Sequence, residues 1–461
     1  MNPEAARWRD EARALRAGQQ MVAADHAIAQ ARTLAPDDRL IAFLQAQSRY
    51  ELGYPAAALF AEVCRLWPDN LDALRNRALA EASEGRSDLA LALLRDQLRA
   101  RPGWTEGHRV LAALARVSGD RDGYDASYAA ATSAEPANAA IWLGWFAAVA
   151  QLRDWPRARQ VLAQAEAALG ANRALIEARL FLASESGDMA ETERLLALTA
   201  DWPQPFVRIA AIRHALRSGA PERALAVALP LAQREPASVL AGQVWPYVST
   251  CWRLLGDPRA AWLDGAPPYV VDTAVGLSAA ELAELGVLLR GLHAAQLPYP
   301  EQSVRGGTQT DRSVLLRHEP ILARTREAQL AAMTDYVAGL PPHDPAHPLL
   351  SRPRAGVLIG GSWSVRLQPG GFNVAHSHPR GWISSAFYVD LPEPAVLEAA
   401  PSGHFHYGAP PAELGLDLAH YGTVAPRIGH LVMFPATMWH GTVPFAQGER
   451  LNIAFDGIPV A

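Results

Sequence analysis

The sequence predicts a multidomain α + β protein, with an all-α helical array in its first two-thirds and an all-β domain at its C-terminal end. Three observations lead to this fold class. The chain has 461 residues, which is too long for one ordinary hydrophobic core. Proline and glycine recur in phase with a period of about 34 residues up to about residue 260, with one double interval in each series. Beyond residue 346 this pattern gives way to short β-like runs bounded by glycine or proline.

The helical array is indicated by two sets of residues at fixed spacing. Prolines that end helices are Pro36, Pro68, Pro102, Pro136, Pro203 and Pro236, and glycines at turns are Gly53, Gly85, Gly119, Gly187, Gly219 and Gly256. Because proline cannot donate the next helical hydrogen bond and glycine relieves a tight turn, each period predicts a pair of helices. The period, with small residues such as Ala56, Ala90 and Ala224 at the helix crossing, resembles the tetratricopeptide repeat. About seven units fit between residues 5 and 260, although the unit near Asp154 lacks its glycine.

Helix pairs of this kind stack into a superhelix with a concave surface, because one pair alone cannot bury its apolar face. Two uses of that surface stay open at this point. The groove could capture a peptide or protein partner, or the array could be a rigid spacer or a surface for homodimerisation.

Composition excludes several classes of function. The 42 basic and 47 acidic residues give a net charge of −5, which offers no electrostatic case for a nucleic-acid or membrane surface. All basic residues are arginine, so neither a lysine Schiff base nor a P-loop can form. The N-terminus has no apolar stretch typical of a secretory signal, and no run of 18 apolar residues occurs. Cys64 and Cys251 lie far apart in helical surroundings. We therefore expect a cytoplasmic protein.

The last third changes from helical to β-like patterns. Helices are expected at 279–295 and 319–340. Between them, residues 305–310 (RGGTQT) predict a loop, either a mobile lid that brings Arg305 or Gln309 to a substrate or a simple turn. Short strands are expected at 362–367, 383–391, 404–407, 430–435 and 450–456, which is the spacing of an antiparallel sandwich or barrel.

Histidines are concentrated in this β region, where seven of the 14 lie between His376 and His440. His376 and His378 alternate along an extended segment, so their side chains point to the same face. His440 follows a strongly apolar run and could reach the same point from a facing sheet. Arg450 begins the next strand, where a guanidinium can hold a carboxylate through two hydrogen bonds. Three ligands on one face of an octahedral ion leave room for a 2-oxo acid and O₂, as in non-haem iron oxygenases.

These residues lie in segments that resemble the 2-oxoglutarate/Fe(II)-dependent oxygenases found fused to tetratricopeptide repeats in bacteria. The matching segments are EQSVRGGTQT, GSWSVRL, GGFNVAHSHPRGWISSAFYVDLP and GHLVMFPATMWHGTVPFAQGERLNIAFD. The resemblance covers most of residues 301–456. It implies a double-stranded β-helix, or jelly roll, that uses Fe(II), 2-oxoglutarate as co-substrate and O₂.

The resemblance also implies roles for individual residues. His376, His378 and His440 would occupy the three iron-ligand positions, and Arg450 would bind the distal carboxylate of 2-oxoglutarate. Tyr388 would help to hold that carboxylate, and Asn373 would form part of the pocket wall.

One feature departs from the wider superfamily, which has Asp or Glu at the position of His378. A neutral imidazole leaves the site one negative charge poorer, which should raise the Lewis acidity and the redox potential of the iron. Two arrangements stay open: His378 binds iron directly, or it orients the substrate while water takes the third ligand position.

The expected domains are a solenoid at 1–275, a helical and loop connector at 276–345 and an oxygenase core at 346–461. We expect a dioxygenase that hydroxylates a peptide or protein side chain recruited by the repeats. Two alternatives remain: a small-molecule oxygenase whose repeats serve oligomerisation, and a non-catalytic adaptor with a degenerate oxygenase fold. The attached solenoid motivates the peptide substrate, and this link is one of association.

Overall fold

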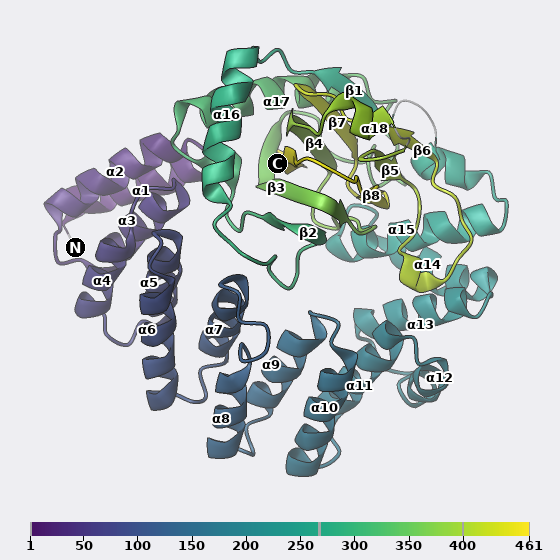
Figure 1. Cartoon of the computed structure of the whole chain (residues 1–461), viewed down its shortest axis with the longest axis horizontal. Coiled ribbons are helices and arrows are strands. Elements are labelled where there is room, and N and C mark those ends of the chain that lie inside the picture. Colours follow the sequence, from purple (N-terminus) through teal and green to yellow (C-terminus); the bar gives the residue numbers. More distant parts are fainter. Residues whose placement is uncertain (1, 266–268, 399–400, 461) are drawn as a thin grey trace.

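The N-terminal part of the computed structural model, which describes residues 2–265, 269–398 and 401–460, is a solenoid of paired helices. The helices are α1 (Pro3–Ala17), α2 (Met21–Leu34), α3 (Arg39–Glu51), α4 (Ala57–Leu66), α5 (Leu71–Ser83), α6 (Ser87–Ala100), α7 (Thr105–Val117), α8 (Ala126–Ala134), α9 (Ala139–Ala150), α10 (Trp155–Leu169), α11 (Arg173–Ser186), α12 (Met189–Leu198), α13 (Pro205–Arg217), α14 (Pro221–Arg234) and α15 (Val239–Leu254). Figure 1 shows them curving in an arc around the C-terminal sheets. The predicted tetratricopeptide-like solenoid is confirmed.

The repeat pattern has a local backbone cause. Each of the six predicted turn glycines has a positive φ, between 66° and 103°, which residues with a Cβ rarely adopt. Arg101, which precedes Pro102, is extended at φ −137° and ψ 69°, because proline disfavours the helical conformation in the residue before it. In the turn that lacks its glycine, Arg153 itself takes φ 58°. For a residue with a Cβ this conformation costs roughly 1–2 kcal/mol.

The C-terminal part consists of two antiparallel sheets. The larger has the strand order β1-β7-β4-β9-β3-β2 and the smaller β6-β5-β8. The strands are β1 (Val271–Ala274), β2 (Val304–Gln309), β3 (Val357–Asn373), β4 (Ile383–Asp390), β5 (Phe405–Tyr407), β6 (Gly422–Val424), β7 (His430–Pro435), β8 (His440–Thr442) and β9 (Arg450–Pro459). Phe405 of the smaller sheet packs on Phe434 of the larger, with ring centroids 4.7 Å apart. The fold is the expected jelly roll.

Further helices cover the outer face of the larger sheet. They are α16 (Ala279–Leu292) and α17 (Pro320–Ala338). Elsewhere the chain has a short α18 (Pro394–Glu398) and three single turns, η1 (Ala261–Gly265), η2 (Val314–Leu316) and η3 (Ala412–Leu414). Leu289 of α16 and Met333 of α17 share one buried cluster with Phe387, Ile453 and Phe455 of the sheet. This cluster is the main core of the β domain, and two smaller apolar clusters lie apart from it, one around Val365 and Phe445 and one around Phe405 and Phe434.

The expectation of a loop or lid at 305–310 is wrong, because residues 304–309 form β2 and pair with β3. The two glycines that suggested a loop serve the strand. Gly306, at φ 65°, lies where the register shifts, and a Cβ on Gly307 would come within 2.3 Å of the Arg366 carbonyl oxygen. Strand β1 pairs with β7 from within the expected solenoid range. The expected boundaries after residues 275 and 345 therefore do not delimit the sheet, which takes strands from all three segments.

The turns of the solenoid hold the β domain on their concave side. The Gln19 side-chain amide donates to the Ile359 carbonyl oxygen at 2.7 Å and accepts from the Ile359 N–H at 3.0 Å. Farther along the arc, the His318 N–H donates to the Leu52 carbonyl oxygen at 3.1 Å. The concave surface therefore faces the protein's own β domain (Figure 1).

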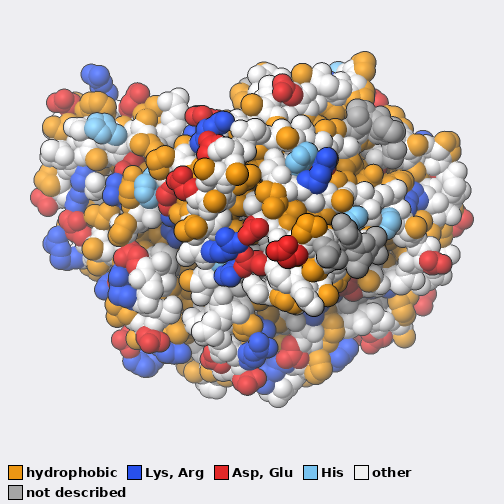
Figure 2. Space-filling view, turned by 45° about the horizontal axis from the view of Figure 1, so that its top comes forward, with side chains coloured by type: hydrophobic (Ala, Val, Ile, Leu, Met, Phe, Trp, Pro, Cys, Tyr) orange, Lys and Arg blue, Asp and Glu red, His pale blue; other side chains and the backbone are white. Residues whose placement is uncertain are grey.

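On the surface, acidic and basic side chains lie interspersed across the face shown in Figure 2. Among the described residues, no helix combines the length and the apolar character needed to cross a bilayer.

Candidate active site

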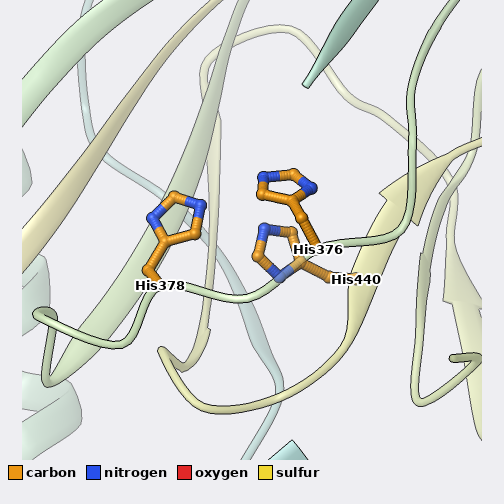
Figure 3. A group of neighbouring side chains, drawn as sticks. All are labelled: His376, His378 and His440. Carbon is orange, nitrogen blue, oxygen red and sulfur yellow. The ribbon is translucent and has the colours of Figure 1, made fainter. Parts of the chain in front are cut away.

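Three histidines meet at one end of the jelly roll (Figure 3). His376 and His378 lie on the extended segment after β3, and His440 begins β8. The His376 N–H donates to the His440 carbonyl oxygen at 2.9 Å, and the reverse hydrogen bond measures 3.0 Å, so this bridge fixes the two residues side by side. One ligand atom from each of the three imidazoles lies within 4.8 Å of the others, which fits a single metal ion.

Hydrogen bonds at the Nδ1 atoms orient all three rings. The Nδ1 of His376 lies 2.7 Å from the Val374 carbonyl oxygen, and the Nδ1 of His440 lies 3.0 Å from the Met438 carbonyl oxygen. A carbonyl oxygen can only accept, so Nδ1 carries the proton and Nε2 keeps its lone pair. This is the tautomer that a metal ion binds.

Burial keeps the imidazoles of His376 and His440 neutral. It lowers the pKa of His376 to about 3, with a further contribution from neighbouring His378. Burial also lowers the pKa of His440 well below its usual value. Neutral imidazoles can bind a cation without first losing a proton, so the cluster is suited to a metal at neutral pH.

Asp456, which no sequence pattern singled out, contacts the third histidine, His378. Its carboxylate oxygens lie 2.7 and 2.8 Å from the Nδ1 of His378, and the Ser384 hydroxyl donates to it at 2.6 Å. A signal was available: Asp456 lies six residues after Arg450, so the two side chains share one face of β9.

Arg450 and Tyr388 lie deeper in the same domain. Arg450 is 1% exposed, and burial lowers its pKa. Its guanidinium lies 5.0 Å from the Tyr388 ring centroid and donates to the Gly403 carbonyl oxygen at 3.1 Å. Its Nε and the Tyr388 hydroxyl have no hydrogen-bond partner, and no described carboxylate forms an ion pair with Arg450. A buried cation with unused donors is suited to an anionic ligand.

Asn373 ends β3 near the cluster. Its side-chain amide donates to the Ser303 hydroxyl at 3.0 Å, and its backbone N–H donates to the Thr442 hydroxyl at 2.9 Å. Ser303 lines the cleft described next. The expected role of Asn373 in a pocket wall stays a prediction.

A cleft of about 800 Å³ leads from the histidines to the solenoid. One wall belongs to the β domain and includes Trp363, His376 and His378. The opposite wall belongs to the solenoid and includes Arg153, Arg213, Val239, Gln243 and Tyr247. The cleft is open to solvent. Its two walls come from the two parts of the chain, so the solenoid is part of the candidate site.

The last solenoid helix, α15, also supports the histidine segments directly. A Cβ on Gly242 would lie 2.5 Å from the carbonyl oxygen of Pro379, the residue after His378. The indole N–H of Trp439, the residue before His440, donates to the Pro246 carbonyl oxygen at 3.1 Å. Pro246 lies inside α15, and this contact uses its carbonyl oxygen. Only glycine at position 242 allows α15 to approach the Pro379 backbone this closely.

The fold and the site together define a class. A jelly roll with three imidazoles around one point, and a buried arginine without an ion-pair partner on a neighbouring strand, is suited to a non-haem metal oxygenase.

Comparison with known proteins agrees with this class. Residues 361–456 match the family model described as "Putative 2OG-Fe(II) oxygenase". These residues are thus similar to a 2-oxoglutarate/Fe(II) oxygenase domain, and the chain joins them to a tetratricopeptide-like solenoid. No curated protein matches the chain.

The solved structures that match include a repeat protein and two hydroxylases. A tetratricopeptide repeat protein from Parabacteroides merdae is 14% identical, with a TM-score of 0.32, covering 50% of this chain and 92% of that one. A viral collagen prolyl hydroxylase from Paramecium bursaria Chlorella virus-1, as a 2-oxoglutarate complex, is 13% identical with a TM-score of 0.28, covering 42% and 98%. A prolyl-4-hydroxylase from Pseudomonas putida is 18% identical with a TM-score of 0.29, covering 42% and 95%.

Fe(II), 2-oxoglutarate and O₂ are the cofactor and co-substrates of such a domain, and the described residues fit them. Imidazole nitrogen is a ligand suited to Fe(II). The unpaired donors of Arg450 and Tyr388 match the free carboxylate of a dicarboxylic acid.

Proposed function

We propose that this protein is a 2-oxoglutarate- and Fe(II)-dependent dioxygenase that hydroxylates a side chain of a peptide or protein held between its two domains. His376, His378 and His440 would hold the iron through their Nε2 atoms. Arg450, with the Tyr388 hydroxyl, would bind the distal carboxylate of 2-oxoglutarate. Bound Fe(II), with 2-oxoglutarate and O₂, supplies the conversion of a C–H bond to C–OH while 2-oxoglutarate is split into succinate and CO₂.

The protein's own residues position the reactants and exclude water. The backbone bridge between His376 and His440 fixes two of the ligands relative to each other. Phe405 and Phe434 pack on the His440 ring, with centroids 5.9 and 4.5 Å away, and keep that side of the site dry. His376 and His378 line the open cleft, so a substrate can approach the site from the cleft.

The proposal of a peptide substrate is supported by the openness of the cleft and by the origin of its two walls. A cavity of about 800 Å³ would also take a metabolite. A pocket for a metabolite, however, buries most of the surface of its ligand. This cleft is open, and one of its walls is the concave surface of a repeat array, a surface that repeat proteins use for extended partners. A chain lying along the solenoid could thus extend one side chain to the histidines.

The proposal is tested with the full-length protein, Fe(II), 2-oxoglutarate, O₂ and a pool of synthetic peptides of random sequence. We expect succinate release above that of a His376→Ala control, together with peptides that gain the mass of one oxygen. Succinate release driven by metabolites but by no peptide would contradict a peptide substrate and favour the small-molecule alternative. Failure to bind metal or 2-oxoglutarate at micromolar concentration would favour the adaptor.

A matched pair of variants tests the use of the solenoid wall. Val239 is 46% exposed and lines the cleft, whereas Val22 is 58% exposed and lies on α2, outside the residues that line it. Val239→Arg should lower peptide hydroxylation at least tenfold and leave 2-oxoglutarate affinity unchanged, while Val22→Arg should change neither. Equal peptide turnover by both variants would contradict the use of this cleft.

A further inference from the structure

One histidine of the cluster differs from the other two in the hydrogen-bond partner of its Nδ1 atom. The Nδ1 atoms of His376 and His440 each face a neutral backbone carbonyl oxygen. The Nδ1 of His378 faces both carboxylate oxygens of Asp456 instead, at 2.7 and 2.8 Å. Three neutral imidazoles bring no charge to a divalent ion, whereas the common set of two histidines and one carboxylate brings one negative charge.

We infer that Asp456 is a positioning residue that acts through His378. Through its hydrogen bond to the Nδ1 of His378 it supplies the negative charge that the three-histidine set lacks. This inference rests on the proposed metal site. A carboxylate that accepts the Nδ1–H of a ligating histidine fixes the ring and makes its Nε2 a stronger donor. Asp456 therefore favours direct ligation by His378 over a role in orienting the substrate.

The position of Asp456 behind His378 excludes a simpler role as a ligand. The group of ligand atoms that lie within 4.8 Å of one another contains the three histidines and not Asp456. Its carboxylate lies on the Nδ1 side of the ring, and Nε2 is on the opposite edge. Asp456 therefore reaches the ion site through the imidazole.

The fold holds the carboxylate in one place. Ser384 is the register partner of Asp456 in the β4–β9 ladder, and its hydroxyl donates to the carboxylate at 2.6 Å. On the other side, a Cβ on Gly381 would lie 3.1 Å from the Asp456 carboxyl carbon, so the glycine leaves room for this side chain. Such enclosure is expected of a group whose orientation matters for a ligand.

The test measures Co(II) and Fe(II) binding to the full-length protein, without 2-oxoglutarate or peptide. Asp456→Asn should weaken Co(II) affinity 10- to 100-fold, the range typical for outer partners of metal ligands, and Asp456→Glu should recover most of that loss. The matched control is Asp264→Asn, since the Asp264 carboxylate likewise accepts from a serine hydroxyl, that of Ser249, and lies outside the histidine cluster. The control should keep wild-type affinity.

A second measurement, the Fe(III)/Fe(II) reduction potential, distinguishes an electrostatic effect of Asp456 from an effect on packing alone. The anionic partner should stabilise ferric iron more than ferrous iron, so Asp456→Asn should raise the Fe(III)/Fe(II) potential. A tenfold larger loss of ferric affinity corresponds to a rise of about 59 mV. Ser384→Ala, which leaves the carboxylate in place, should shift the metal affinity and the potential in the same direction by a smaller amount. This variant replaces Asp456→Asn in the test if Asp456→Asn does not fold.

Two results would overturn the inference. One is unchanged affinity and potential in Asp456→Asn, or changes equal to those of Asp264→Asn. The other is a further loss of affinity when Asp456→Asn is added to His378→Ala, because a residue that acts through His378 has no effect once that imidazole is removed. Metal binding needs no substrate, so a failure to oxidise any peptide would count against the proposed function and leave this result intact.

Discussion

Arg450 offers the sharpest test of how the site binds its co-substrate. Replacing it with methionine keeps much of the side-chain volume and removes the charge. In the ligand-free protein the guanidinium has one hydrogen bond, to the Gly403 carbonyl oxygen, and its charge is buried without a described carboxylate partner. Losing that bond costs about 1 kcal/mol, and removing an unpaired buried charge offsets this cost. The unfolding free energy without ligand should therefore stay within about 1 kcal/mol of wild type.

The effect on 2-oxoglutarate should be much larger. Two hydrogen bonds from a guanidinium to a carboxylate contribute roughly 1.5–3 kcal/mol each, so Arg450→Met should weaken binding by roughly 10²- to 10⁴-fold. Isothermal calorimetry with Mn(II) in place of Fe(II) measures this loss. Wild type at a ligand concentration of 100 Kd should gain about 2.7 kcal/mol of stability, seen as a rise in thermal midpoint, and the variant should gain almost none.

Arg366→Met is the matched control, because Arg366 lies on adjacent β3 and forms a partly exposed ion pair with Glu449. It should keep wild-type affinity for 2-oxoglutarate. The reasoning is refuted if 2-oxoglutarate stabilises Arg450→Met as much as wild type. Loss of several kcal/mol of stability without ligand would equally show that Arg450 is a structural residue.

Further predictions concern the metal site and the sheet that carries it. His376→Ala should abolish Co(II) binding while far-UV circular dichroism stays unchanged; retained binding would remove it from the ligand set. Gly242→Ala should weaken Co(II) binding at least tenfold, because its Cβ would displace the Pro379 backbone, whereas Gly291→Ala, in open space, should not. Burial lowers the pKa of His293 to about 4, so only the unfolded chain takes up its proton between pH 6.5 and 4. Stability should therefore fall by about 2 kcal/mol between pH 7 and 5 through this group, measured by urea unfolding, and His293→Asn should flatten that decline.

The solenoid could be predicted from the sequence because its signals are local. A glycine such as Gly85 is favoured where φ is 82°, and a proline such as Pro102, which follows the last residues of α6, disfavours the helical conformation in the residue before it. The exception is informative: the repeat that lacks its glycine places Arg153 at the cleft, where it forms an ion pair with Glu413. A departure from the local rule thus coincides with a contact to the other domain.

The site could be predicted in part. Alternation along a strand is enough to place His376 and His378 on one face, and the apolar run before His440 indicates a neighbouring strand. Asp456 was missed because its partner, His378, is 78 residues away in the chain, and only the pairing of strands brings the two together. A sequence shows which side chains can share a face, and long-range pairing decides which of them touch.

The sequence by itself determined the two-part architecture, the chemistry of three imidazoles and a guanidinium, and the absence of lysine from any mechanism. Only the tertiary structure decided that Gly306 and Gly307 belong to a strand, since their close approach to β3 is invisible in a glycine-rich segment. It also decided that the concave side of the solenoid encloses the protein's own β domain and leaves a cleft between them. The physical reason is the same in both cases: backbone conformation is a property of neighbouring residues, whereas packing is a property of residues that the sequence keeps far apart.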